Sequence, residues 1–434
     1  MPERASVYQT LILGVESTST PGVQVTANKR MLDFMAEVRP VIPVPAYRPQ
    51  GSVAPTTNTA QKENTAGTYS GQIGYNSLIY ILASLLKSPS ITTPSGGSTA
   101  RRHTFKPANF TPDTFQTYTF DKGSSVGAER FGFGIFGSGT FRWTRTEANL
   151  TGNVMGQVMT EGVTINPSPT DIPALPLDPR SVSVWVGSSY TTEEVQTIST
   201  GGTVSGGTFT ISYDQQTTAP IAFGATATAV QAALRLLPNI GANNITCAGG
   251  PLPATPVTIT TAGQLSGLDI SLMTANGAAL TGAAPTIAIA ATTPGGMTKL
   301  LRVSSAEIAI PDRYGYGFTL NQSDPSYSFA VQLGLEPTAQ LVLEHDSASV
   351  ALMTSLRSRT TLYCKIMALG PTIETVTSPF LNQVSFFFPF RFIEADRGDV
   401  DGVFANTFNM SLIYEPITFQ GWLQVDVDNN LAAL

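Results

Sequence analysis

Apolar and polar residues alternate along most of this 434-residue chain, which is the pattern of half-buried β-strands. In residues 139–144, Phe141 and Trp143 fall on one face of the expected strand, and Thr140, Arg142 and Thr144 fall on the other. Residues 207–213 alternate in the same way. Turn residues separate such segments along most of the chain, so the pattern predicts a fold dominated by β-strands with a few helices.

Three segments have the spacing of amphipathic helices instead. The first begins at Asn76 or Ser77, the second covers residues 225–237, and the third begins at Asp346 or Ser347. Each starts at a residue type that commonly caps a helix, or is stopped by a following proline. In the third helix we expect three residues to point inward: Val350, Met353 and Leu356.

Five prolines fall between residues 40 and 55, where they exclude a regular helix and interrupt any sheet ladder. Two interpretations stay open for this stretch. It is either an extended arm or a disordered linker, because a loop of this length is usually functional or disordered.

The middle of the chain is almost uncharged. Between Gln196 and Met297 the formal charges are Asp214, Arg235 and Asp269. This change in composition predicts an inserted β-rich module at 191–297, within a larger domain made of residues 1–190 and 298–434.

The larger domain shows signs of duplication. Without residues 191–297 it has 327 residues, and the first and third helices begin 164 residues apart, which is half of that length. The strands "TFRWTRTE" and "TFNMSLIYE" follow the two helices at similar distances. We therefore expect two copies of one β-rich unit, each a β-sandwich or barrel that carries one packed helix.

Composition limits the possible partners. Charged residues make up 12% of the chain and its formal net charge is −6, which argues against binding nucleic acid by neutralising phosphates. The longest apolar run with helical character has nine residues, whereas a membrane span needs about twenty. The first residues lack the pattern of a signal peptide, so we expect synthesis in a cytoplasm and no membrane partner.

We expect no catalytic, cofactor-binding or metal-binding residues, and no enzymatic activity. His103 and His345 cannot form a metal cluster with the distant Cys247 and Cys364, which we expect to be unpaired thiols. The motif "GFGIFG" precedes a strand rather than a helix, so it indicates a glycine-rich turn and not a dinucleotide site. The acidic stretch "EADRGDVDG" is typical of a solvated hairpin loop rather than a calcium site.

The segment "QVSFFFPFRF" is the most apolar strand. Four phenylalanines share one face: Phe386, Phe388, Phe390 and Phe392. Two interpretations stay open, because this face can belong to the core of one chain or lie at an interface between subunits.

Two parts of the chain resemble phage structural proteins. The segment "TTAPIAFGATATAVQAALRLLPNIGANNITCAGGP" resembles a module that is inserted in structural proteins of tailed phages, although Cys247 stands where Val is usual. The flanking regions are similar to tail tube (major tail) proteins of the siphophage type, through "GVESTSTPGVQVTA", "GQIGYNSLIYILASLL" and the strands "LDPRSVSVWVG" and "KLLRVSS".

This resemblance implies a structural virion protein that polymerises into stacked rings, with hexameric or trimeric pseudo-sixfold symmetry. The rings would form the tail tube, through which DNA passes without specific binding. Implied partners are other copies of the chain, the tape measure protein and the tail terminator and tip proteins. The inserted module would project outward. Glu147 and Glu415 end the two matched strands and are candidates for lining the lumen, or else ordinary surface residues at strand ends.

Two alternatives differ in class. A tail fibre or adhesin-like protein would bind carbohydrate through exposed aromatic residues, for which Trp143, Trp185 and Trp422 are candidates. A tail-associated polysaccharide-degrading enzyme would need a pair of carboxylates in a groove.

Overall fold

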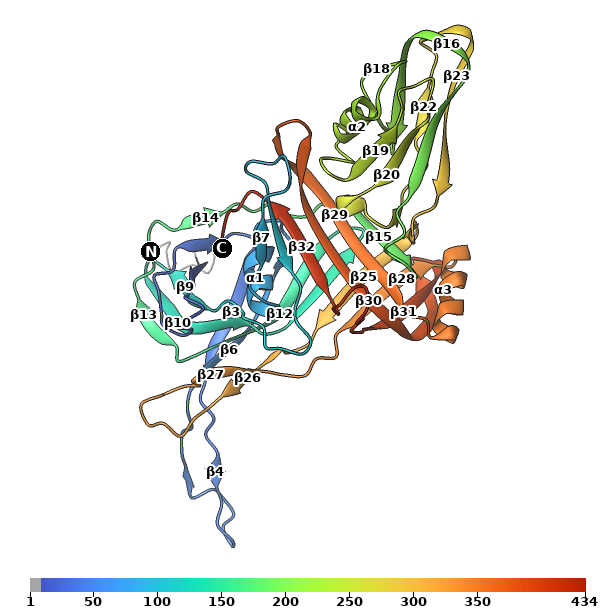
Figure 1. Ribbon diagram of the computed structural model, residues 1–434. Helices are drawn as coiled ribbons and strands as arrows, with labels where there is room; N and C mark the ends of the chain where they lie inside the picture. Colours follow the sequence, from blue (N-terminus) through green and yellow to red (C-terminus); the bar gives the residue numbers. More distant parts are fainter. Residues whose placement is uncertain (1–8) are drawn as a thin grey trace.

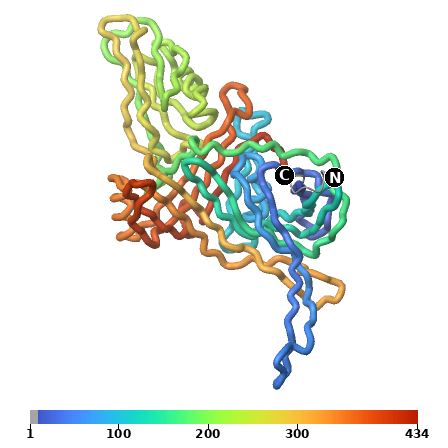
Figure 2. The backbone as a smooth tube through the Cα atoms, turned by 180° about the vertical axis from the view of Figure 1, so that it is seen from behind, coloured from blue at the N-terminus to red at the C-terminus, as the bar shows by residue number. Residues whose placement is uncertain are grey.

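A computed structural model of the protein describes residues 9–434, and that range contains thirty-two strands and three α-helices. Strands dominate, which confirms the expected fold class. The chain forms a broad body, a module that projects from one end of the body and a slender arm that extends from the opposite end (Figure 1). Seen from behind, the module and the arm again point in opposite directions (Figure 2).

The first set of elements ends at residue 156 and builds two layers around helix α1. In one layer β2, β1, β9 and β10 pair in that order, all antiparallel. In the other layer the order is β3, β6, β12 and β11, also antiparallel. The bounds are β1 Thr10–Val15, β2 Lys29–Met31, β3 Phe34–Val41, β6 Asn64–Gln72, α1 Leu78–Leu85, β9 Tyr118–Ser124, β10 Gly127–Phe136, β11 Gly139–Thr144 and β12 Ala148–Gly156.

The second set has the same two layers of strands, although its helix α3 has only two buried residues. One layer has the order β24, β15, β29 and β30, and the other has the order β25, β28, β31 and β30. Strand β30 belongs to both layers, because its first half pairs with β29 and its second half with β31. The bounds are β15 Val182–Gly187, β24 Met297–Leu300, β25 Val303–Ile310, β28 Thr338–Glu344, α3 Ser347–Ser358, β29 Leu362–Thr375, β30 Pro379–Val400 and β31 Val403–Leu412.

The two sets correspond strand by strand, with β10 and β11 together matching the two halves of β30, and we call them the first and second repeat. Their local details also agree. Phe136 lies opposite Val154 and Phe392 lies opposite Met410, and one extra residue interrupts the ladder just after each phenylalanine. The interval between corresponding residues is 256 at both positions. The hairpin turns that follow, at 144–147 and 400–403, keep the same interval.

This correspondence corrects the strand matching expected from the sequence. The strand that contains "TFRWTRTE" is β11, and its counterpart is the second half of β30 rather than β31. Strands β11 and β31 also run in opposite directions, since β25 and β28 lie between them and every pairing is antiparallel. The few letters that the two segments share are therefore coincidental.

The remaining body strands extend these layers or form short hairpins. Strands β8 and β7 continue the sheet beyond β32, which pairs with β30, while β13 and β14 pair with β10 and β2. The proline-rich stretch is an extended arm that carries the two-stranded pair β4–β5. The bounds are β4 Ala46–Tyr47, β5 Thr57–Asn58, β7 Ser90–Thr92, β8 Arg101–Phe105, β13 Thr160–Val163, β14 Thr170–Ile172, β26 Tyr314–Gly317, β27 Phe329–Gln332 and β32 Gln424–Asn429.

The helices begin close to where the sequence predicts, but the buried face of α3 differs from the predicted one. Every residue of α1 is buried, so this helix lies inside the first repeat. In α3 the Asp346 carboxylate accepts a hydrogen bond from the Ser349 amide, which caps the helix. Val350 is 50% exposed, contrary to expectation, and the inward face instead contains the buried Leu352 with the partly buried Met353 and Leu356. Residues 349, 352, 353 and 356 follow the helical period, and Val350 lies outside it.

The uncharged middle of the chain forms a sheet of its own. The long strands β16 and β23 pair with each other, β20 and β19 extend the sheet, and Val230 and Leu234 of α2 are fully buried. The bounds are β16 Val195–Tyr213, β17 Gln216–Thr217, β18 Ile221–Ala222, α2 Ala227–Arg235, β19 Ile245–Gly249, β20 Val257–Thr261, β21 Leu268–Asp269, β22 Thr274–Asn276 and β23 Leu280–Thr293.

The module is joined to the body by more than its two connecting segments. Its apolar cluster continues into Trp185, Tyr363 and Phe419 of the body, and β21 pairs with β24. The Gly296 amide donates to the Thr192 carbonyl oxygen at 3.0 Å, so the two ends of the insertion meet. Beneath the module lies Lys365, whose Nζ donates to the carbonyl oxygen of Gln264 at 2.5 Å.

Lys365 gives the junction a pH dependence. Burial lowers the pKa of Lys365 to about 8, although nearby Asp426 partly offsets this effect. Between pH 8 and the pKa of an unfolded lysine, about 10.4, the folded chain binds fewer protons than the unfolded chain, so its stability should rise with pH. We expect Lys365→Met to lose this rise. Comparing the urea midpoints of the two proteins from pH 7 to pH 10 tests it, and parallel curves would contradict the assignment.

Candidate assembly face

The two repeats share one continuous sheet of eight strands. Its order is β3, β6, β12, β11, β25, β28, β31 and the second half of β30. The joint between the repeats is the ladder of β11 and β25, where six consecutive residue pairs run from Gly139 opposite Ile310 to Thr144 opposite Ser305. In the order of strands across the sheet, the joint therefore places the last strand of the first repeat, β11, beside the first strand of the second repeat, β25.

One face of this sheet is apolar and buried in the body. It contributes aromatic and aliphatic side chains from most of the strands to the main core: Phe34, Tyr69, Leu150, Phe141, Trp143, Ile308, Leu341, Phe408 and Met410. Strand periodicity then places the intervening residues on the opposite face. That alternation is what the sequence pattern predicts for a sheet with one covered side.

The opposite face is predominantly polar, with Met35, Ala309 and Val342 as apolar exceptions, and we call it the polar face. Most of its residues are small, uncharged and exposed or half-buried: Thr68, Ser70, Asn149, Thr151, Thr140, Thr144, Ser305, Thr338, Thr407 and Ser411. The pairings align such residues in rows across the strands. One row consists of Gln72, Asn149, Arg142, Glu307, Gln340, Asn409 and Glu394.

That row carries one cation, Arg142, and two anions, Glu307 and Glu394. Arg142 and Glu307 face each other across the joint at 4.0 Å, and the Gln340 side-chain amide donates to Asn409 Oδ1 at 2.9 Å. Exposed pairs of this kind contribute at most about 1 kcal/mol, so they align the strands more than they stabilise them. The face holds no cluster of lysine and arginine that would bind phosphates tightly.

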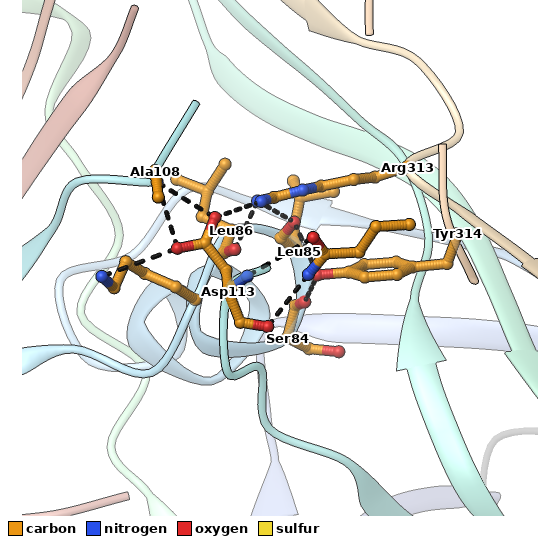
Figure 3. Close-up of polar contacts among 9 residues, drawn as sticks. Ser84, Leu85, Leu86, Ala108, Asp113, Arg313 and Tyr314 are labelled. Carbon is orange, nitrogen blue, oxygen red and sulfur yellow. Dashed lines mark hydrogen bonds and ion pairs between the residues drawn. The ribbon is translucent and has the colours of Figure 1, made fainter. Parts of the chain in front are cut away.

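A buried ion pair locks the joint from the side of the core. After β25 the chain crosses onto the first repeat, where the guanidinium of Arg313 lies 2.5 Å from the carboxylate of Asp113 (Figure 3). Arg313 also donates to the carbonyl oxygens of Leu85 and Leu86 at the end of α1, and the Tyr314 hydroxyl donates to the Ser84 carbonyl oxygen. Because the last carbonyl groups of a helix lack partners within it, a buried cation suits this position.

Two edges of the eight-stranded sheet are open. Within residues 9–434, no strand pairs with the edge of β3 that faces away from β6, or with the edge of residues 391–400 that faces away from β31. Unpaired edges offer main-chain groups to another chain, so they are sites at which a second copy can extend the sheet. The exposed side chains at these edges include Met35 and Arg39 on β3 and Asp396 on β30.

The phenylalanine strand belongs to the core of one chain. Phe386, Phe388 and Phe390 are completely buried and Phe392 is 7% exposed. Phe386 packs against Phe141 and Trp143 of the first repeat. The expectation that these four residues lie at a subunit interface is therefore corrected, because their side chains have almost no surface to offer a partner. A single strand's periodicity cannot distinguish the two environments.

The two candidate lumen residues have different settings. Glu147 is exposed in the turn between β11 and β12. Glu415 follows β31, and its carboxylate accepts hydrogen bonds from the amides of Ile417, Thr418 and Phe419. Burial alone would raise the pKa of Glu415, but these bonds lower it. Since β11 and β31 run in opposite directions, the two glutamates lie at opposite ends of the sheet, and the counterpart of Glu147 is Val403.

The structure also shows where the remaining candidate residues from the sequence analysis lie. Trp143, Trp185 and Trp422 are all at most 7% exposed. Cys247 and Cys364 are free thiols, and no group of metal-ligating side chains occurs within residues 9–434. The motif "GFGIFG" lies mostly within β10 and not in a turn. None of the helices between residues 9 and 434 is long and apolar enough to span a bilayer.

Comparisons of the sequence with known protein families and with curated proteins found no match.

The buried ion pair at the joint gives a direct test of its importance. Arg313→Ala leaves the buried Asp113 carboxylate without its closest cation, and removing one partner of such a pair usually costs about 3–5 kcal/mol. We expect a loss of that size in urea unfolding. The control is Arg302→Ala, whose ion pair with Glu344 is exposed and should matter by less than about 1 kcal/mol. Equal losses in the two variants would show that Arg313 does not hold the repeats together.

Proposed function

We propose that this chain is a structural subunit that assembles with copies of itself into rings, and that the rings stack into the tail tube of a phage. The observation that carries the proposal is the eight-stranded sheet, built from two repeats that meet edge to edge. The edges left free at its two ends, on β3 and on residues 391–400, are the counterparts of the two edges that pair in the internal joint. Repeating the internal joint between copies would extend the sheet around a ring. Rings of this kind are what the resemblance to tail tube proteins implies.

The stagger of the strands supports closure into a barrel. The row that contains Glu307 passes through Arg142, Asn149 and Gln72 and reaches β3 at Asp33. The counterpart of Glu307 on β3 is Glu37, because the pairings of Glu307 through β28 to β31 match those of Glu37 through β6 to β12. Glu37 is four residues away from Asp33, so four strands shift the register by four residues. A shift of one residue per strand corresponds to a tilt of about 35°, which is typical of closed barrels.

The polar face suits the wall of a DNA channel. Its small hydroxyl and amide side chains, and a row in which Glu307 and Glu394 outnumber Arg142, offer few sites at which phosphates would be held. The inserted module follows β15 and returns to β24, and both strands belong to the layer behind the eight-stranded sheet. In a tube with the polar face inward, the module would lie outside. The tape measure, terminator and tip proteins are the further partners that this proposal implies, and the virion tail is the location.

The three tryptophans that suggested a carbohydrate-binding fibre are not exposed, so they do not support that alternative. All three tryptophans are in the core, where they cannot stack on a sugar. The proposal therefore keeps the assembly function as the one that the geometry supports.

Assembly can be measured directly. We expect the purified protein to form rings or tubes with a central channel in negative-stain electron micrographs, and fast-sedimenting species that increase with concentration. Purified tail tips serve as nucleators if spontaneous assembly is slow. A protein that remains monomeric at high concentration with and without tips would contradict the proposal.

The orientation of the polar face can be tested with bulky thiol reagents. We expect Thr338→Cys, on the polar face, to react in the unassembled chain with a maleimide coupled to a large protein, and to be protected in tubes. Thr203→Cys, which is exposed on the module, should react in both states. The native Cys364 is buried and Cys247 partly so, and the unsubstituted protein gives their background. Equal reactivity of Thr338→Cys in tubes would place the polar face outside.

A further inference from the structure

We infer that residues 391–400 of one copy pair with β3 of the next copy in the register of the internal joint, and that this register places Asp396 directly opposite Arg39. The inference rests on the proposed assembly and names the contact that would produce it. Its basis is the internal joint, which shows how the end of one repeat meets the beginning of another.

The register follows from two intervals. On the β30 side, the bulge after Phe136 and Phe392 and the hairpin turns fix an interval of 256 residues, so Thr140 corresponds to Asp396. On the β3 side, Glu37 lies opposite Thr68 and Thr68 opposite Asn153, just as Glu307, Gln340 and Asn409 follow one another. Asn153 and Asn409 are again 256 apart, so Glu37 corresponds to Glu307.

The sequence gives the same alignment independently. Residues 36–38 read Ala-Glu-Val and residues 306–308 read Ala-Glu-Ile, an interval of 270. Arg39 therefore corresponds to Ala309. Because Thr140 lies opposite Ala309 in the internal joint, Asp396 should lie opposite Arg39 in the joint between copies.

The side chains that this register brings together are compatible. Asp396 and Arg39 carry opposite charges, both are exposed, and neither takes part in an ion pair within residues 9–434. Met35, which is 70% exposed in the single chain, would lie opposite Val400. Glu37 would lie opposite Gly398, which leaves it room, and Pro40 would fall at the end of the ladder, where a missing amide has least effect.

The charge pair also distinguishes the joint between copies from the joint within a chain. The internal counterparts of Asp396 and Arg39 are Thr140 and Ala309, which carry no charge. An edge of β30 would therefore match β3 better than it would match a second β25. The internal joint has its own charge pair at a different position, Arg142 with Glu307, and charge pairs placed at different positions are a common way to specify partners.

The arm points to the same neighbour. In the second repeat, the segment that follows β25 crosses the joint and packs on the first repeat, where Tyr327 contacts Phe133. The corresponding segment after β3 is the arm, which extends away from its own chain with Ile42 47% and Tyr47 62% exposed. Under the same operation it crosses the joint onto the second repeat of the copy whose residues 391–400 pair with this β3, and that repeat would cover these residues.

The register is tested by charge reversal. We expect Asp396→Arg or Arg39→Asp alone to raise the concentration needed for assembly by about tenfold, which corresponds to about 1.4 kcal/mol per joint. The double variant should restore assembly. Glu161→Arg, an equal change at an exposed position on β13, is the control and should have no effect. Single variants that assemble like the unaltered protein, or a double variant that does not recover, would overturn the pairing of these two residues.

A disulfide test separates the register from the function. Residues directly opposite each other in antiparallel strands have Cβ atoms about 4.5–5.5 Å apart, close enough for oxidation to join them with slight adjustment. We expect Asp396→Cys with Arg39→Cys to give covalent oligomers in assembled rings, and Asp396→Cys with Met35→Cys, four residues out of register, to give none. Rings that form without the first cross-link would overturn the register and leave the proposed function standing. Absence of any assembly by the unaltered protein would overturn both.

Discussion

The main-chain ladder between β11 and β25 is the contact on which the rest of the structure depends. Six residue pairs join the two repeats through backbone groups, so the repeats form one sheet rather than two packed domains. A ladder fixes direction and register together, because a shift by one residue would turn every side chain to the other face. The continuous polar face, the common core beneath it and the two open edges all follow from this one contact.

Side-chain ion pairs on both faces of the sheet reinforce the register that the ladder of β11 and β25 sets. On the polar side the joint carries the exposed pair of Arg142 and Glu307, and on the core side it carries Arg313 with Asp113 and the end of α1. The buried pair is the more specific of the two, since a buried guanidinium requires all its partners in place. The internal joint is thus a covalently tethered example of a contact that separate copies can form.

The repeats differ mainly in their connections. Between β1 and β2 the chain needs only residues 16–28, whereas between β15 and β24 it accommodates the whole module. Surface connections tolerate such insertions because their ends already lie close together. The module nevertheless shares apolar surface and the buried Lys365 with the body, which fixes its position more firmly than two linkers would.

Much of this fold could be predicted from local patterns. Alternation at Phe141 and Trp143, the cap at Asp346, and the change of composition near residue 191 each marked an element that the structure contains. Helix α1 also starts after Ser77, although the Ser77 hydroxyl donates to Asp33 and does not cap the helix. The match between the repeats could be located only roughly. Its true alignment depends on registers and on a shared bulge, which a comparison of letters does not reveal. Letter matches such as Ala-Glu-Val at 36–38 with Ala-Glu-Ile at 306–308 agree with that alignment but are too short to find it.

The candidate site was harder to predict for a physical reason. A strand with a fully apolar face, such as Phe386–Phe392, looks the same in a core and at an interface, and only the layer packed against it decides. Glu415 likewise looked like a strand-end acid, but it binds the amides of its own turn. The open edges, which carry the proposed function, consist of main-chain groups and leave no trace in the sequence.

A high-resolution electron cryomicroscopy map of the assembled protein tests the central claim most directly. The account predicts a barrel whose ladder continues without a break from β30 of each chain to β3 of the next, with the polar face toward the axis and the module outside. Three chains of eight strands each would complete the ring that the resemblance implies. A map in which chains meet through other surfaces, with β3 and the end of β30 still unpaired, would contradict it.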